Sequence, residues 1–223
     1  ISYRVKVLIP EQQVWCDENT TRPEHVLRSM TGAMIDYVIT GIDRESDCCT
    51  ASRRSAMYVR RKAFTKLAPK VGKKVPVSVM AVGAAHLLAN CGGFDLTLSQ
   101  RDLSYGMLGD LRDKYHPGET LTGVLKEYDE ENQSIKVSVK EAEPHPFEGV
   151  EIRYPLNCRR ASVISGKYKG GVFCKLEENL DCLCTYSMYQ NDEDFDVGDQ
   201  VIVVSTKYDY ERKLGYGKIV AKW

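Results

Sequence analysis

The chain has 223 residues, of which 43% are hydrophobic and 28% charged, a composition typical of a folded protein with two modules or three small ones. Its 31 basic and 31 acidic residues cancel, so no overall positive charge attracts nucleic acid and any such contact must be local. No apolar run approaches the roughly 18 residues that span a bilayer, which argues against a membrane protein.

One pattern occurs three times along the chain, at residues 34–53, 119–140 and 199–222. In each copy, a strand-like run leads through a turn containing aspartate into a second strand-like run. Alternating apolar residues around a polar turn predict a β-hairpin. Gly32, Gly118 and Gly198 precede the three copies, where a permissive backbone would start the strand. The spacing of the hairpins suits small five-stranded barrels.

A positively charged segment follows the first hairpin. From Arg53 to Lys74 there are nine basic residues and no acidic one. Apolar residues near helical spacing predict a linker helix that ends before Pro69. Its basic face is either solvated or in contact with phosphates. The run from Glu177 to Asp199 is the opposite, with eight acidic residues and no basic one, and is expected to avoid phosphates.

The residues before the third hairpin carry a more specific signal. A strand-like run at 159–163 is followed by a glycine-rich run at 166–176 that contains Phe173, by a third run at 180–187, and then by Gly198-Asp199. This order resembles the S-one RNA-binding repeat of bacterial ribosomal protein S-one and several ribonucleases. The second copy follows the same order less closely, with strands at 75–82, 86–89 and 93–98, and the first copy keeps only residues 5–15 and its hairpin.

The resemblance implies an all-β chain of tandem five-stranded oligonucleotide-binding (OB-fold) barrels of S-one type, with a short linker helix. Residues 1–67 are expected to form an incomplete barrel without its opening strands, together with the basic helix. Residues 68–143 and 144–223 are expected to form two further barrels.

The resemblance also implies a site for single-stranded RNA on the third barrel. Such barrels stack bases on flat rings flanked by cations. The expected RNA-binding residues are Tyr168, Phe173, Lys167, Lys169, Lys175, Arg159 and Thr185, the last at a position where the family often has histidine. Periodicity alone leaves open whether Phe173 faces outward or lies in the barrel core.

No catalytic or metal site is evident. The four histidines are scattered, and the eight cysteines lack the paired spacing of a zinc or redox motif. Cys182 and Cys184 are expected to share one buried face as free thiols, which fits a cytoplasmic protein. We therefore expect no enzyme activity, no cofactor and no metal.

The preferred function from the sequence is binding of single-stranded RNA in translation or RNA metabolism. Two alternatives remain open at this point. The barrels could dock to a ribosome, a polymerase or another protein, or they could bind single-stranded DNA, because base stacking and backbone contacts serve both nucleic acids.

Overall fold

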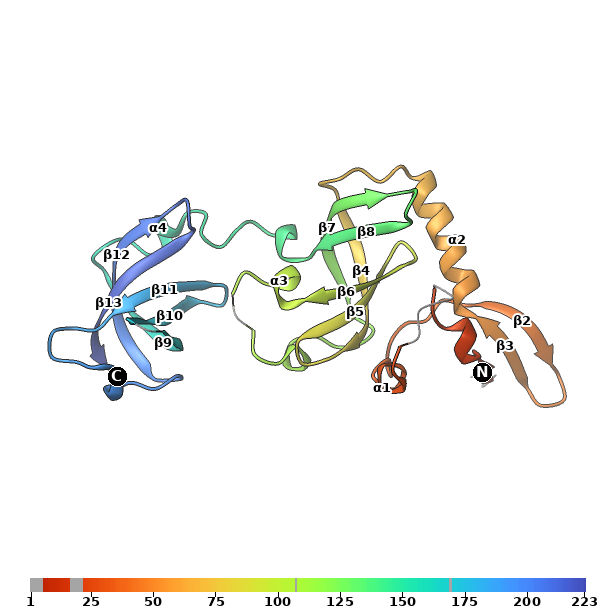
Figure 1. Cartoon of the computed structure of the whole chain (residues 1–223), viewed down its shortest axis with the longest axis horizontal. Helices are drawn as coiled ribbons and strands as arrows, with labels where there is room; N and C mark the ends of the chain where they lie inside the picture. Colours follow the sequence, from red (N-terminus) through yellow and green to blue (C-terminus); the bar gives the residue numbers. More distant parts are fainter. Residues whose placement is uncertain (1–5, 17–21, 107, 169) are drawn as a thin grey trace. The chain divides into compact units, whose positions relative to one another are not determined.

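The computed structural model describes residues 6–16, 22–106, 108–168 and 170–223 (Figure 1). The chain forms two compact units. The first contains residues 1–103 and 108–142, and the second contains residues 104–107 and 143–223. Each unit is described separately below.

The second unit is built around a closed five-stranded barrel with the strand order β10-β11-β13-β12-β9. Its strands are β9 (Arg159–Tyr168), β10 (Gly171–Glu177), β11 (Leu180–Thr185), β12 (Gln200–Asp209) and β13 (Leu214–Lys222). All neighbouring strands run antiparallel except β11 and β13, which are parallel. This strand order and the single parallel pair define the OB fold expected from the sequence.

The interior of this barrel comes from alternate residues of each strand. Val201 and Val203 on β12 are fully buried, whereas Ile202 and Val204, which alternate with them, are not, as the alternating pattern predicts. Cys182 and Cys184 lie side by side in the core with Cys174, all three as fully buried free thiols, which confirms that the first two share a face.

The first unit contains the second barrel, a sheet with the strand order β6-β5-β4-β7-β8. Its strands are β4 (Lys74–Val82), β5 (His86–Cys91), β6 (Phe94–Ser99), β7 (Thr120–Asp129) and β8 (Ser134–Ser138). The two end strands β6 and β8 approach each other, so the barrel is nearly closed. Leu87, Ala89 and Leu125 are among the residues of its core, all with exposures of 1% or less.

The first unit also contains a three-stranded sheet with the order β1-β3-β2, in which β1 and β3 are parallel and β2 and β3 are antiparallel. Its strands are β1 (Lys6–Leu8), β2 (Val38–Asp43) and β3 (Cys48–Ser52). This is the arrangement of β11, β13 and β12 in the closed barrel. Within the described residues 6–16 and 22–52, no strand corresponds to β9 or β10.

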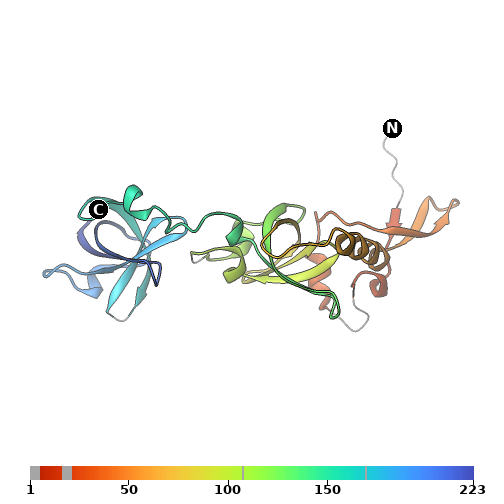
Figure 2. The ribbon, with the colours of Figure 1, turned by 90° about the horizontal axis from the view of Figure 1, so that it is seen from above.

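The predicted linker helix is present as α2 (Arg53–Lys66), and in both views it lies between the three-stranded sheet and the barrel of β4 to β8 (Figures 1 and 2). The Ser52 hydroxyl caps its first turn by accepting a hydrogen bond from the Ser55 N–H at 3.0 Å. The helix ends at Lys66, and Ala68 then adopts a left-handed φ of 45° just before Pro69.

Short helices complete the two units. They are η1 (Glu11–Gln13), α1 (Glu24–Arg28), α3 (Gln100–Leu103), η2 (Leu111–Asp113) and η3 (Lys140–Ala142) in the first unit, and α4 (Val150–Arg153) and η4 (Asp192–Asp194) in the second.

The three predicted hairpins are confirmed, and their turns share one structure. In each turn an aspartate carboxylate accepts a hydrogen bond from the backbone N–H of a residue two or three positions later. The last residue before the second strand has a left-handed φ of 48° to 52°. The aspartates are Asp43, Asp129 and Asp209, and the left-handed residues are Asp47, Gln133 and Lys213. The repeated local chemistry therefore produces a repeated local backbone.

The glycines before the hairpins also behave alike. Gly32, Gly118 and Gly198 have φ values of 94°, 94° and 97°, a region that side chains rarely adopt. In both barrels the glycine N–H donates to the first strand: Gly118 to the Val79 carbonyl and Gly198 to the Ile164 carbonyl, each at 2.9 Å. The glycine thus joins the fourth strand of each barrel to the first.

Candidate nucleic-acid interface

Two aromatic rings meet on the outside of the closed barrel, at the end of β9 and the start of β10. Tyr168 and Phe173 lie with ring centroids 6.2 Å apart and ring planes at 53°. Phe173 is opposite Gly166 on β9. Tyr168 is 58% exposed. The structure therefore brings together the two predicted stacking residues.

The direction of Phe173 follows from its neighbours on β10. Val172 and Cys174 are fully buried in the barrel core. Since successive side chains of a strand point to opposite faces, Phe173 and Lys175 lie on the outer face. The structure therefore selects the outward position for Phe173 over the core position that periodicity left open.

The strand register extends this outer face across the barrel. Phe173 is opposite Leu183 on β11, which is opposite Tyr216 on β13. The next outward pair is Thr185 and Lys218. Because paired residues share a face, Leu183, Tyr216 and Lys218 belong to the same surface as the aromatic pair, here named the aromatic face. The sequence analysis missed these three residues, and only the register of β11 against β13 reveals them.

The cation nearest to the aromatic pair on β10 has an acidic neighbour. Lys175 is paired in register with Asp181 on β11, whose carboxylate also accepts a hydrogen bond from the Ser165 hydroxyl at 3.1 Å. Burial raises the pKa of Asp181, and the hydrogen bond from Ser165 and the charge of Lys175 partly oppose that shift. The positive charge of Lys175 is therefore partly balanced on the barrel itself.

Lys167 has a different position from the one expected of a phosphate-binding residue. Its ammonium group donates to the backbone carbonyls of Asp192 at 2.7 Å and Phe195 at 2.6 Å, and it lies 3.3 Å from the Asp192 carboxylate. It therefore anchors the acidic loop to β9. Lys169, the other lysine of this turn, lies outside the described residues.

We expect replacement of Lys167 by Gln to loosen the acidic loop rather than remove a phosphate contact. Hydrogen bonds from a charged donor contribute about 1.5 kcal/mol or more each, so the second unit should lose stability of roughly that size. Hydrogen exchange at residues 191–199 should increase, whereas Lys207→Gln, an equal charge change on β12, should leave it unchanged. A salt dependence of RNA binding flattened by about 0.7 in Lys167→Gln would instead show a phosphate contact.

Arg159 lies away from the aromatic pair. It begins β9, where it pairs with Val204, whereas Tyr168 ends the same strand. At about 3.3 Å per residue, nine residues of a straight strand extend roughly 30 Å. Arg159 instead lines a pocket of about 370 Å³ with Arg160 and Trp223.

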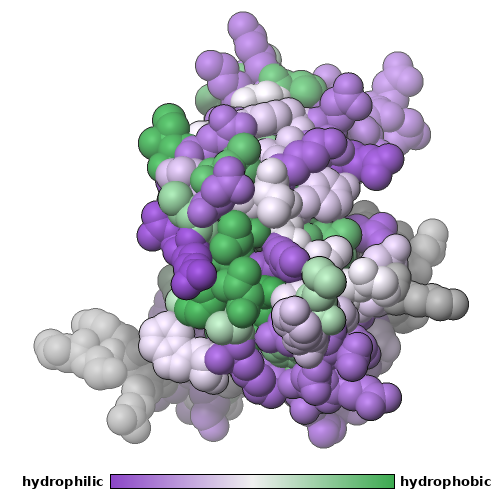
Figure 3. All heavy atoms as spheres, turned by 90° about the vertical axis from the view of Figure 1, so that its left-hand side faces the viewer, coloured by the Kyte–Doolittle hydropathy of each residue, from purple (hydrophilic) through white to green (hydrophobic). Residues whose placement is uncertain are grey.

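The surface of the second unit turned toward the viewer in Figure 3 shows hydrophobic side chains gathered near its centre with hydrophilic ones around them.

The corresponding outer face of the second barrel is covered by the chain itself. Met80 on β4 and Leu88 on β5 pack with Trp15 and Met30 from the N-terminal segment, and all four side chains are no more than 9% exposed. The second strand of this barrel matches the family pattern only weakly. Its outer face is covered by another part of the chain.

A buried ion pair continues this cover toward the β5–β6 turn. The Arg53 guanidinium donates to both oxygens of Asp95, at 2.6 and 2.9 Å, and their side chains are only 1% and 7% exposed. Asn90 donates a further hydrogen bond to Asp95 at 2.8 Å. Burial opposes ionisation of Asp95, but its bonds to Arg53 and Asn90 prevail and lower its pKa. Arg53, counted from the sequence in the basic run, is therefore a core residue.

Strand order and register place the chain in the class of OB-fold proteins with two such barrels, one of which has an open aromatic face. Among the described residues, no helix is long and apolar enough to cross a membrane. The same residues contain no group of three or more His, Cys, Asp or Glu side chains that could hold a metal ion.

Comparisons with known proteins give distant relatives. No protein-family model matches the chain. The small ribosomal subunit protein bS1 of Coxiella burnetii is 22% identical over 67% of this chain and 28% of its own length, and that of Pseudomonas aeruginosa is 20% identical over 86% and 36%. The 4-hydroxy-3-methylbut-2-enyl diphosphate reductase of Clostridium acetobutylicum is 25% identical over 82% and 28%. The chain thus spans 28–36% of the length of these relatives.

Solved structures give only partial superpositions. A chain from the a/eIF2alpha–aDim2p–rRNA complex of Pyrococcus horikoshii has a TM-score of 0.31 and 11% identity over 38% of this chain and 52% of its own. A multidomain protein with nucleic-acid-binding domains from Streptococcus pneumoniae has a TM-score of 0.24 and 14% identity over 69% and 54%. The fold assignment therefore rests on strand order and pairing.

Proposed function

We propose that the chain binds single-stranded RNA on the aromatic face of its closed barrel and acts by binding rather than by catalysis. The observation that supports this proposal is the outward-facing ring pair of Tyr168 and Phe173, supported from beneath by a filled barrel core. Two outward-facing rings on adjacent strands, Tyr168 exposed and Phe173 half-buried, suit successive unpaired bases, because each base has a flat face that can stack.

The remaining residues of the aromatic face suit the sugar-phosphate backbone. Lys218 on β13 lies beside Thr185 on β11, so a cation and a hydroxyl are adjacent. Lys175 lies two residues beyond Phe173 on the same face of β10. A strand whose bases stack on Tyr168 and Phe173 would have its phosphates near these groups. Duplexes would not bind in this way, because their bases are already stacked on one another.

The named relatives favour RNA over DNA as the ligand. Similarity to bS1, a ribosomal protein by name, extends over 67–86% of this chain in two bacterial species. This similarity supports our proposal of a role in translation or RNA metabolism in the cytoplasm. The reductase similarity covers 28% of that enzyme, and we do not extend its reaction to this chain.

Replacing Phe173 by Ala tests the proposal. Loss of one stacked base costs about 1 to 3 kcal/mol, so affinity for a labelled 12-nucleotide oligouridine should fall about 5- to 150-fold. The dependence on salt should stay nearly unchanged, since no phosphate contact is removed. Because Phe173 lies outside the core, thermal melting of the variant should stay close to that of the parent chain. Fluorescence anisotropy at two salt concentrations measures the first two quantities.

Tyr189 supplies the matched control. It is 95% exposed in the same unit and lies outside the aromatic face, so Tyr189→Ala should leave affinity unchanged. Equal losses in the two variants would contradict the proposed site. If the parent chain binds RNA no tighter than about 0.1 mM at physiological salt, the weak end of non-specific binding, the RNA proposal fails. An oligothymidine measured in parallel separates RNA from DNA.

Docking to a ribosome or to another protein is the second candidate. Two observations favour it: the formal net charge of the chain is zero, and Lys167, next to the aromatic pair, is held by the acidic loop. Aromatic rings with few free cations also suit a protein surface. A parent chain that fails to bind either oligonucleotide but retains the aromatic face would support this candidate.

A further inference from the structure

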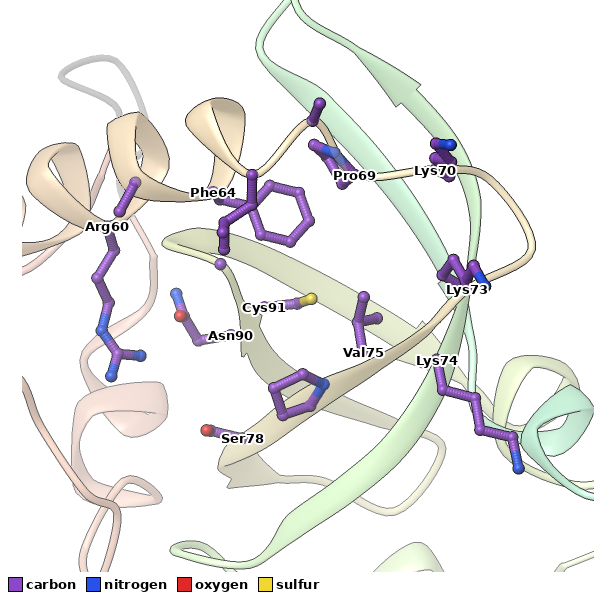
Figure 4. A pocket seen from close by; sticks show the side chains of 15 residues that line it. Arg60, Phe64, Pro69, Lys70, Lys73, Lys74, Val75, Ser78, Asn90 and Cys91 are labelled. Carbon is purple, nitrogen blue, oxygen red and sulfur yellow. The ribbon is translucent and has the colours of Figure 1, made fainter.

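A second surface with the chemistry of a nucleotide site lies in the first unit, in a groove of about 680 Å³ between α2 and the second barrel (Figure 4). The last part of α2 and the loop at residues 67–73 form one wall, and β4 with the end of β5 forms the other. This volume is within the range of about 300–1,000 Å³ typical of small-ligand pockets.

The floor of the groove is apolar. Phe64, Val75 and Cys91 point into the space between the helix and the barrel, as Figure 4 shows, and Pro76 lines it beside them. Phe64 makes edge-to-face contacts with Phe94 and Tyr128, with centroid distances of 6.0 and 5.9 Å, which fix its ring. A preformed apolar floor of this kind suits a flat aromatic ligand.

The border of the groove is positively charged. Lys70, Lys73 and Lys74 lie along the loop and strand that bound it, and Arg60 lies on the helix side (Figure 4). Arg60 pairs with Asp36 at 3.0 Å, but the three lysines have no carboxylate partner among the described residues. None of the residues that line the groove is acidic. Three lysines without a carboxylate partner along one side of the groove favour an anion over a cation or a neutral ligand.

We propose that this groove binds one nucleotide of a single-stranded RNA, with the base on the apolar floor and the adjoining phosphates on Lys70, Lys73 and Lys74. The inference goes beyond the proposed function, since it adds a separate site on a different unit of the chain. It also gives the second barrel a role although its outer face near Leu88 is covered. The groove lies beside the first half of β4, away from that cover.

The test removes the three lysine charges in the 223-residue chain. In the triple variant that combines Lys70→Gln, Lys73→Gln and Lys74→Gln, here called the groove triple, the dependence of log affinity on log salt should flatten by about 0.7 per lost contact. Raising the salt concentration from about 50 to 200 mM weakens the binding of labelled oligouridine in both chains. If all three contacts are lost, this weakening should be about 20-fold smaller in the groove triple than in the parent. A triple control, Lys114→Gln, Lys126→Gln, Lys136→Gln, makes the same charge change at lysines that already contact Tyr115, Glu141 and Glu127. Its salt dependence should match the parent.

Crosslinking locates the contact. Oligouridine containing 4-thiouridine should crosslink to residues 60–78 in the parent and lose that crosslink in the groove triple. A groove triple indistinguishable from the control triple, with Phe173→Ala still impaired, would overturn the groove and leave the aromatic face intact. The reverse result would overturn the aromatic face and keep the groove. If a labelled oligoglutamate of equal charge binds as tightly as oligouridine and loses equally in the groove triple, the groove is a site for acidic protein segments and the RNA inference fails.

Discussion

Arg53→Met should destabilise the first unit by about 3 to 5 kcal/mol, because it leaves the Asp95 carboxylate buried without its counter-charge. Arg53 and Asp95 are separated by 42 residues and join α2 to β6, so the loss should loosen the helix from the barrel. Denaturant unfolding followed by the fluorescence of Trp15, which is 5% exposed in the same unit, measures the effect. Trp223, 77% exposed, contributes a nearly constant background.

The pH dependence of stability should have opposite signs in the parent and in Arg53→Met. In the parent the pKa of Asp95 is lowered, so the stability that it contributes is present above the unfolded pKa of about 3.9 and is lost as pH falls through the folded pKa. In Arg53→Met, burial without the cation raises that pKa. The variant should therefore lose stability as pH rises above about 4, a range in which the contribution of Asp95 to the parent is already complete and constant.

Two further variants complete the test of the ion pair. Arg60→Met, on the same helix, breaks an ion pair whose side chains are 49% and 48% exposed, and should cost less than about 1 kcal/mol. Adding Asp95→Asn to Arg53→Met removes the buried charge and should restore much of the lost stability. A parent-like pH dependence in Arg53→Met would mean that Asp95 is not held by Arg53.

Trp15→Ala should destabilise the first unit by a comparable amount. Truncating a buried Trp typically costs about 3 to 5 kcal/mol, and here the side chain covers Met80 and Leu88 on the outside of the second barrel. The uncovered apolar surface should increase binding of the dye ANS, which reports exposed hydrophobic side chains. Calorimetry provides the stability measurement, since the fluorescent residue itself is removed.

Trp223→Ala is the matched control, because the chain has two tryptophans and this one is 77% exposed. It should change neither the unfolding temperature nor dye binding. Unchanged stability and unchanged dye binding in Trp15→Ala would show that the N-terminal segment does not cover the barrel face.

Local pattern was enough to predict much of the fold. The three hairpins, their starting glycines and the helix that ends before Pro69 each depend on residues close together in sequence, where alternation and turn chemistry decide the backbone. The N-terminal cover could not be predicted in this way. Trp15 and Met30 lie in irregular segments without a regular apolar period, and their partners on β4 and β5 are more than 45 residues away.

The candidate site was only partly predictable for a similar reason. Phe173 is flanked by Val172 and Cys174, so apolar residues occupy both faces of β10 and alternation could not assign one to the interior. Lys167 looked like a free cation because its partners, the Asp192 and Phe195 carbonyls, are backbone groups 25 and 28 residues away. Arg53 was grouped with surface lysines because charge alone does not reveal a buried partner.

The three-stranded sheet has a consequence for handling the protein in solution. Within the described part of the chain, β1 and β2 each pair only with β3, so one side of each backbone offers unused hydrogen-bonding groups. Leu8, Val38, Ile39 and Ile42 on these strands are 41–70% exposed. Unprotected edges with apolar side chains are templates for strand addition by another molecule. Self-association at high concentration should therefore begin at this sheet. The closed barrel has no free edge and should not take part in strand addition.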